Sequence, residues 1–274
     1  MVQTKEYITM LGTGAAMVTT CYNTCFTISS SDSEEHMLVD GGGGNGLLVQ
    51  LEKVGISPLQ IHNVFVSHNH SDHILGVVWL IRAVAQHINK GRYEGDLNIY
   101  AHPKSLDALQ TISKFVMQSK LTVHFGNRIK FNPIGDKTEE TIDGREFKFF
   151  DIRSVKELQH GFTCRTKNGK KLTFLGDEPY NDSEEDYAKD SDLLMQESYC
   201  MYADVEKFHP YEKHHGTALD SCRNAEKVMA KATLLFHTEG KTPMAERKEN
   251  YTAEGKTVYS GTIYVPNDLE IIEI

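Results

Sequence analysis

The sequence predicts an α/β protein. Strand-like and helical segments alternate from one end of the 274 residues to the other. No proline-, glycine- or serine-rich linker and no repeat divides the chain, whose length suits one large domain or two small ones. We therefore expect a single domain over residues 1–274.

Composition restricts the class of protein further. Hydrophobic residues make up 39% of the chain and charged residues 24%, as in soluble globular proteins. No apolar run approaches the roughly 20 residues of a membrane span, and Met1–Glu6 has no apolar signal-peptide core. We expect a cytoplasmic protein that does not enter a membrane.

Charge and cysteine content also restrict the class of protein. The net charge is −9, and no Lys/Arg cluster is visible along the sequence, although folding could assemble one. This counts against an extended contact with RNA or DNA phosphates. Five scattered cysteines predict free thiols, and a second metal site at Cys21 and Cys25 is the weaker alternative.

The expected strands are short runs rich in β-branched, aromatic and other apolar residues. In order, they are Tyr7–Leu11, Thr24–Ser29, Met37–Asp40, Ile61–Ser67, Asp96–Ala101, Phe147–Ile152, His160–Thr166, Lys171–Leu175, Leu193–Gln196, Thr233–Phe236, Thr262–Val265 and Leu269–Ile272. Asn168-Gly169 marks a hairpin turn between two of them. Residues 121–145 give only mixed short strands and turns.

The expected helices are Gly46–Val54, Ile74–Ile88, Pro103–Gln118, Thr217–Ala230 and a polar stretch near Pro243–Asn250. Ile74–Ile88 is apolar nearly all round and so predicts a buried helix. Pro103 suits a first helical turn, and Thr217 with Asp220 three residues later forms a capping pattern.

The segment Ser67–His73 carries the strongest functional signal. His68, His70, Asp72 and His73 are four potential metal ligands between a buried strand and a buried helix. An extended segment points residues two apart to the same side. One tetrahedral ion does not easily use four ligands from so short a loop, whereas two ions roughly 3.5–4 Å apart can. The alternative is a polar loop with chance histidines.

Further ligand-type residues follow other apolar runs. Asp177, Glu197 and His237 each come directly after one, and strand ends are where α/β proteins converge side chains on one point. Asp40 ends another strand and could accept the free N–H of a metal-bound histidine. The glycines of 41–44 could cradle a phosphate or form a plain tight turn.

Together these motifs resemble the metallo-β-lactamase superfamily and, within it, ribonuclease Z. The resemblance covers roughly residues 7–240 and rests on ordered motifs. They are Gly12-Thr-Gly14, Asp40-Gly41-Gly42, Ser67–His73, Gln196-Glu197, His215-Gly216-Thr217 and His237. It implies an αββα sandwich of two mixed sheets with helices outside.

The resemblance also implies roles for single residues. His68 and His70 would bind a first ion; Asp72, His73 and His237 would bind a second; Asp177 would bridge both. Nitrogen and oxygen ligands without thiolate favour two Zn²⁺ ions, with Mn²⁺ or Fe possible. Water between the ions would be the nucleophile, and Asp72 could orient it.

His215 would donate a proton to the leaving oxygen, held by Glu197. The alternative for His215 is a structural histidine that caps or packs.

The sequence departs from ribonuclease Z in two places. The family carries a third histidine for the first ion ahead of a Gly-aromatic pair, but Ser154–Glu157 contains none. His160, beside Gly161-Phe162, either supplies that ligand after a register shift or is an ordinary strand or surface histidine. Between His160 and Asp177 there is room for one hairpin only, so the long RNA-binding arm is absent.

The sequence therefore predicts a metal-dependent hydrolase, with a phosphodiesterase acting on a small or cyclic phosphodiester as the leading hypothesis. A 3′-tRNA endonuclease is the second, so RNA is a possible but not favoured substrate. An ester, thioester or lactone hydrolase, an iron-dependent oxidoreductase and a non-catalytic metal-binding protein remain alternatives. A homodimer is left open.

Overall fold

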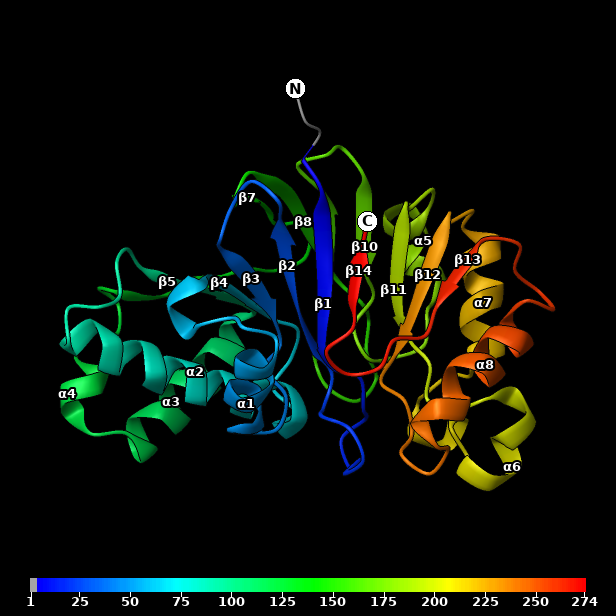
Figure 1. The fold of residues 1–274 in the computed structure, drawn as a ribbon, viewed down its shortest axis with the longest axis horizontal. Coiled ribbons are helices and arrows are strands. Elements are labelled where there is room, and N and C mark those ends of the chain that lie inside the picture. Colours follow the sequence, from blue (N-terminus) through cyan, green and yellow to red (C-terminus); the bar gives the residue numbers. More distant parts are fainter. Residues whose placement is uncertain (1–3) are drawn as a thin grey trace.

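Two β-sheets face each other, and helices cover both outer faces (Figure 1). This arrangement is seen in a computed structural model that describes residues 4–274. It is the αββα sandwich of two mixed sheets that the sequence resemblance implied. The expectation about Met1–Glu6 falls partly on residues 1–3, which lie outside the described residues.

The first sheet has the strand order β14-β1-β2-β3-β4-β5-β6. Its strands are β1 (Glu6–Gly12), β2 (Cys25–Ser30), β3 (His36–Val39), β4 (Ile61–Val66), β5 (Leu97–Ala101), β6 (Ile129–Pro133) and β14 (Ile271–Glu273). The neighbours from β14 to β3 are antiparallel, and those from β3 to β6 are parallel.

The second sheet has the order β13-β12-β11-β10-β9-β8-β7. Its strands are β7 (Glu139–Ile142), β8 (Arg145–Asp151), β9 (His160–Arg165), β10 (Lys171–Phe174), β11 (Leu193–Glu197), β12 (Ala232–Phe236) and β13 (Thr262–Tyr264). Here β7 to β10 pair antiparallel, which includes the predicted β9–β10 hairpin, and β10 to β13 pair parallel.

Aromatic rings fill the space between the sheets. Phe65 of β4 stacks on Phe149 of β8 at 5.1 Å and meets Phe162 of β9 edge-on at 5.5 Å. Phe26 of β2 meets Phe174 of β10 edge-on at 5.4 Å. Rings that are wholly buried contribute much of the core energy, so these contacts hold the two sheets in a fixed relation.

The helices make two separate outer cores. Against the first sheet lie α1 (Gly46–Lys53), α2 (Ser71–Asn89), α3 (Pro103–Val116) and α4 (Ser119–Thr122). Against the second lie α5 (Glu185–Ala188), α7 (Ala218–Lys227) and α8 (Met244–Gly255), with α6 (Val205–Phe208) in the segment before α7. None of the helices within residues 4–274 has the length and apolar composition needed to cross a membrane.

Several boundaries differ from the sequence predictions. Helix α2 begins at Ser71 rather than Ile74, so Asp72 and His73 lie in its first turn. The β6 and β7 strands, in the segment that gave no clear prediction, are short and partly exposed, so their apolar pattern is weak. The predicted cap of α7 is confirmed: Thr217 and Asp220 form a capping box.

Candidate metal centre

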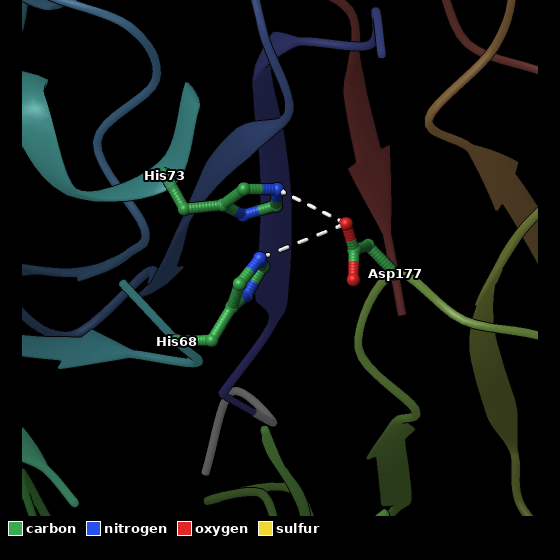
Figure 2. Close-up of side chains that lie close together, drawn as sticks. All are labelled: His68, His73 and Asp177. Carbon is green, nitrogen blue, oxygen red and sulfur yellow. Dashed lines mark ion pairs between the residues drawn. The ribbon is translucent and has the colours of Figure 1, made fainter. Parts of the chain in front are cut away.

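The predicted ligand residues gather where strands of both sheets end. His68 follows β4, Asp177 follows β10 and His237 follows β12. The carboxyl ends of parallel strands lie at one edge of a sheet, and the two sheets bring these edges together. Figure 2 shows the His68 and His73 side chains pointing toward Asp177.

One carboxylate oxygen lies at the centre of this group. Asp177 Oδ2 is 3.7 Å from His68 Nε2, 3.5 Å from His73 Nε2 and 3.6 Å from His237 Nε2. All four side chains are buried. Two sets of three ligand atoms are close enough to hold an ion: His68, His73 and Asp177, and Asp72, His73 and His237.

Hydrogen bonds fix which nitrogen of two histidines faces the centre. His73 Nδ1 lies 2.8 Å from Asp40 Oδ2, so this nitrogen donates to the carboxylate. Ser67 Oγ donates to Asp40 Oδ2 at 2.7 Å and is 2.9 Å from His68 Nδ1, which therefore donates to the serine oxygen. The Nε2 lone pairs of both rings thereby face the centre; that of His73 has no hydrogen-bond partner, and that of His68 faces His70 Nδ1.

The third histidine is oriented in the same way. Thr24 Oγ1 donates to Gly14 O at 3.1 Å and lies 3.2 Å from His237 Nδ1. Because its hydrogen is used for Gly14, the hydroxyl oxygen accepts from the histidine. His237 Nδ1 therefore carries the hydrogen, and its Nε2 faces Asp177. The backbone of His237 has a φ of 59°, a conformation that non-glycine residues rarely adopt outside strained or functional positions.

The electrostatics favour the ligand forms of His68, His237 and Asp177. Burial opposes ionisation of His73, but the carboxylates around it, Asp40 foremost, raise its pKa well above its usual range. Burial lowers the pKa of His237 to about 3 and the pKa of His68 well below its usual range. Burial opposes ionisation of Asp177, but the neighbouring histidines, His68 foremost, hold its pKa well below its usual range. Neutral imidazoles and an ionised carboxylate are the forms that bind metal ions.

These residues fit a divalent cation. His73 Nε2 and Asp177 Oδ1 are buried and have no hydrogen-bond partner. Bare acceptor atoms that face one another without a donor between them are costly, and a cation among them removes that cost. All ligand atoms are nitrogen or oxygen, and no cysteine belongs to either set of three.

His70 and His160 stand apart from the two sets. His70 Nδ1 lies 2.9 Å from His68 Nε2, so both nitrogens face the same space. His160 is buried and its Nδ1 has no hydrogen-bond partner, but its ring stacks on His102 at 5.3 Å. Its backbone N–H donates to Ser67 O at 3.0 Å. This bond fixes the backbone directly after β4, next to His68.

The glycines after Asp40 pack backbone against backbone. Gly41 N donates to His73 O and Gly76 N donates to Gly42 O, both at 2.8 Å. A Cβ on Gly76 would lie 1.7 Å from Gly41 O, so only glycine allows this approach. Gly41 and Gly42 therefore form a tight turn against α2, which holds Asp40 close to His73.

His215 and Glu197 lie beside this centre. His215 Nδ1 is 3.5 Å from Glu197 Oε2, and neither atom has a closer partner; the other carboxylate oxygen accepts the Gly216 N–H at 2.5 Å. The His215 ring lies 5.2 Å from that of His237. Burial raises the pKa of Glu197.

A cleft of about 610 Å³ opens over the centre, a size that suits a small organic ligand. It exposes His70, Asp72, Asp177, His215 and His237 on one wall. Other walls come from residues 15–19 and from the segments that carry Tyr199, Phe208 and Glu239. The Tyr199 ring stacks on His215 at 5.1 Å.

Some residues of the site had no sequence signal. Thr24 directly precedes the β2 strand and Ser67 directly follows β4, yet each supplies the acceptor that orients a histidine. Lys156, in the turn before Gly161-Phe162 where no histidine stands, lines the cleft. The contact of Thr24 and the position of Lys156 follow only from the pairing of distant segments.

Comparisons with known proteins assign the family. The model of the family described as "Anti-Pycsar protein Apyc1" matches residues 7–254. The chain belongs to this Apyc1 family. Ribonuclease Z of Thermococcus sibiricus is 23% identical over 308 residues, covering 97% of this chain and 96% of that protein.

Solved structures show the same fold. The metallo-β-lactamase fold protein YhfI from Bacillus subtilis has a TM-score of 0.79 at 19% identity, with 98% of this chain and 99% of that chain covered. A diphosphatase from the PhnP family has a TM-score of 0.74 at 17% identity, with 98% and 97% covered.

These matches confirm the predicted metallo-β-lactamase fold and the ribonuclease Z-like resemblance. This Apyc1-family chain is a metal-dependent hydrolase. Between His160 and Asp177 it has only the β9–β10 hairpin, with no inserted arm.

Proposed function

We propose that this protein is a phosphodiesterase that hydrolyses small or cyclic phosphodiesters with the help of two divalent metal ions. The observation that carries the proposal is the position of His215. An imidazole with a buried carboxylate behind it lies on the cleft wall 5.2 Å, ring to ring, from the candidate ligand His237. That is where a proton donor for a leaving oxygen is needed.

The residues that would hold the ions divide into two groups. A first ion would be bound by His68, His70 and Asp177, with His160 as a further candidate only if its ring leaves His102. A second would be bound by Asp72, His73, Asp177 and His237. This nitrogen and oxygen set favours Zn²⁺, with Mn²⁺ or Fe as alternatives. When bound, the ions supply positive charge to the phosphate and an activated water as nucleophile.

The side chains of this chain would do the rest. Asp72 lines the cleft and would orient the attacking water. His215 would donate a proton from Nε2 to the oxygen that leaves phosphorus, because its Nδ1 faces Glu197. Glu197 would hold that ring in place, and its other oxygen is already fixed by Gly216 N–H.

The cleft supports a small substrate. Its size suits a nucleotide-sized ligand, and the hairpin between His160 and Asp177 leaves no arm to grip a long RNA. Ribonuclease Z-type cleavage of tRNA precursors is the second candidate, favoured by the match to a ribonuclease Z over nearly the whole chain. The Glu197–His215 pair favours phosphoryl chemistry over the ester, thioester and lactone alternatives.

We also propose that the chain forms a homodimer. Phe115, Val116 and Val123, around the end of α3 and of α4, are 86%, 60% and 68% exposed, which is unusual for residues so apolar and so close together. The molar mass from light scattering should be that of a dimer for the native protein and that of a monomer for Phe115→Asp. A monomeric native protein would contradict the proposal.

Turnover measurements test the function. The metal content is first measured by elemental analysis. Hydrolysis of bis(p-nitrophenyl) phosphate and of 3′,5′-cyclic nucleotides is then compared with that of a thioester, a lactone and a tRNA precursor. We expect turnover of the small phosphodiesters with weak salt dependence, and poor cleavage of the precursor with steep salt dependence. Efficient precursor cleavage at physiological salt would favour the second candidate, and turnover of the thioester or lactone alone would exclude a phosphodiesterase.

A further inference from the structure

Folding assembles a lysine cluster that is not visible along the sequence. Lys156, Lys207, Lys213 and Lys241 all line the cleft over the candidate metal centre, although they come from three separate segments of an acidic chain. Lys156 differs from the other three because its side chain is only 21% exposed, whereas theirs are on the open rim.

The turn that carries Lys156 is tied to the metal centre through one carboxylate. Glu178, next in sequence to Asp177, accepts hydrogen bonds from Ser154 Oγ at 2.5 Å and from Val155 N at 3.4 Å. Ser154 Oγ in turn accepts the backbone N–H of Lys156 at 3.2 Å. The backbone of Lys156 is therefore held in a fixed relation to Asp177.

The amino group of Lys156 is not satisfied by these contacts. Its nearest carboxylate oxygen is Glu178 Oε1 at 3.8 Å, beyond hydrogen-bond distance, and Nζ makes no hydrogen bond within the described part of the chain. An ammonium group that lines the cleft without an acceptor at hydrogen-bond distance is available to bind an anion there. An anion in the cleft would supply the missing acceptor.

We propose that Lys156 binds a non-bridging oxygen of the substrate's phosphate. The inference rests on the proposed phosphodiesterase function and deepens it. A phosphodiester carries its negative charge on those oxygens, and more charge collects near them as the leaving oxygen departs. A fixed ammonium at that point stabilises the bound substrate and the transition state, whereas a neutral carboxylic ester gains much less from it.

The test uses Lys156→Gln, which removes the charge, and Lys156→Arg, which keeps it. Lys120→Gln is the matched control, because Lys120 is exposed on α4 and does not line the cleft. The measurements are made on metal-loaded protein: metal content, melting temperature, the affinity for inorganic phosphate by calorimetry, and kcat and KM for bis(p-nitrophenyl) phosphate.

We expect full metal content and an unchanged melting temperature in all three variants. Phosphate affinity should fall at least about 10-fold in Lys156→Gln, with kcat/KM falling about 100-fold, the usual scale for one lost donor to a developing charge. Lys156→Arg should recover most of both, and the control should match the native protein.

Unchanged phosphate affinity in Lys156→Gln would overturn the proposal. So would a loss of phosphate affinity that comes with lost metal or lowered melting temperature in both Lys156 variants, since that pattern is the one expected of a structural lysine. If the native protein hydrolyses no phosphodiester, the proposed function fails, while the phosphate titration still decides whether Lys156 binds phosphate.

Discussion

Replacing Asp40 with asparagine tests the orientation of His73 at the candidate metal centre. The Asp40 carboxylate is buried and accepts three hydrogen bonds: Ser67 N at 2.8 Å, Ser67 Oγ at 2.7 Å and His73 Nδ1 at 2.8 Å. Asparagine has the same shape but only one acceptor oxygen. Whichever way its amide turns, two donors face each other and at least one hydrogen bond is lost.

The structure sets the size of the effect. Losing a buried hydrogen bond to a charged group and leaving a donor unsatisfied should cost about 2–4 kcal/mol of folding free energy. The metal affinity should fall about 10- to 100-fold, because the carboxylate fixes the Nδ1–H tautomer that leaves Nε2 free. Asp40→Ala should cost more stability, since it leaves all three donors without an acceptor.

Two assays separate the effects. Zn²⁺ affinity is measured by competition with a chromophoric chelator, and the free energy of unfolding is measured with urea in the presence of EDTA. Asp268→Asn is the matched control. Its carboxylate accepts bonds from Thr13, Tyr22 and Gln50 but touches no candidate ligand, so this variant should lose stability and keep its metal affinity.

An Asp40→Asn protein that binds Zn²⁺ as tightly as the native protein would refute the tautomer argument. Equal losses of affinity in Asp40→Asn and Asp268→Asn would refute it too, because affinity would then follow stability alone.

Three further predictions concern single residues. Asp177→Ala should lose both ions, because Asp177 alone would touch both; full metal stoichiometry by elemental analysis would exclude the bridging role. His215→Ala should keep its metal but lose about 10²–10⁴-fold in rate, least for p-nitrophenolate, which leaves without a proton; equal loss across a leaving-group series would exclude the general acid. Burial raises the pKa of Glu184 well above its usual range, so the folded state keeps a proton that the unfolded chain releases as pH rises above about 4.5. The free energy of unfolding should therefore fall as pH rises above that value. Glu184→Gln should have a higher free energy of unfolding at pH 7 than the native protein, and this quantity, measured with urea, should depend less on pH. An unchanged pH dependence in Glu184→Gln would contradict the prediction.

Much of the candidate site was predictable because its signals are local. One short segment contains His68, His70, Asp72 and His73, so metal binding can be predicted from the sequence before the fold is known. Asp177 and His237 were predictable for a different reason. Each follows an apolar strand, and parallel strands bring their carboxyl ends to one edge.

Other contacts depend on how distant segments meet. Thr24 and His237 are 213 residues apart and form a pair only because the start of β2 and the end of β12 lie at the same place. The same limit applies to His160. Its position beside Gly161 made it a candidate ligand, but the start of β9 sets its ring against His102, and no local pattern predicts that stacking.

The candidate centre links metal binding to the arrangement of the two sheets. The first sheet and its α2 helix supply His68 and His73, and the second supplies Asp177 and His237. The Nε2 atoms of the three histidines lie within 3.5–3.7 Å of Asp177 Oδ2. These ligand side chains are held in position by the buried phenylalanine layer, by the Asp40 carboxylate and by the hydroxyls of Thr24 and Ser67. Contacts within the protein therefore orient the ligand residues, and such fixed ligands favour the affinity for an ion because less order has to be imposed on binding.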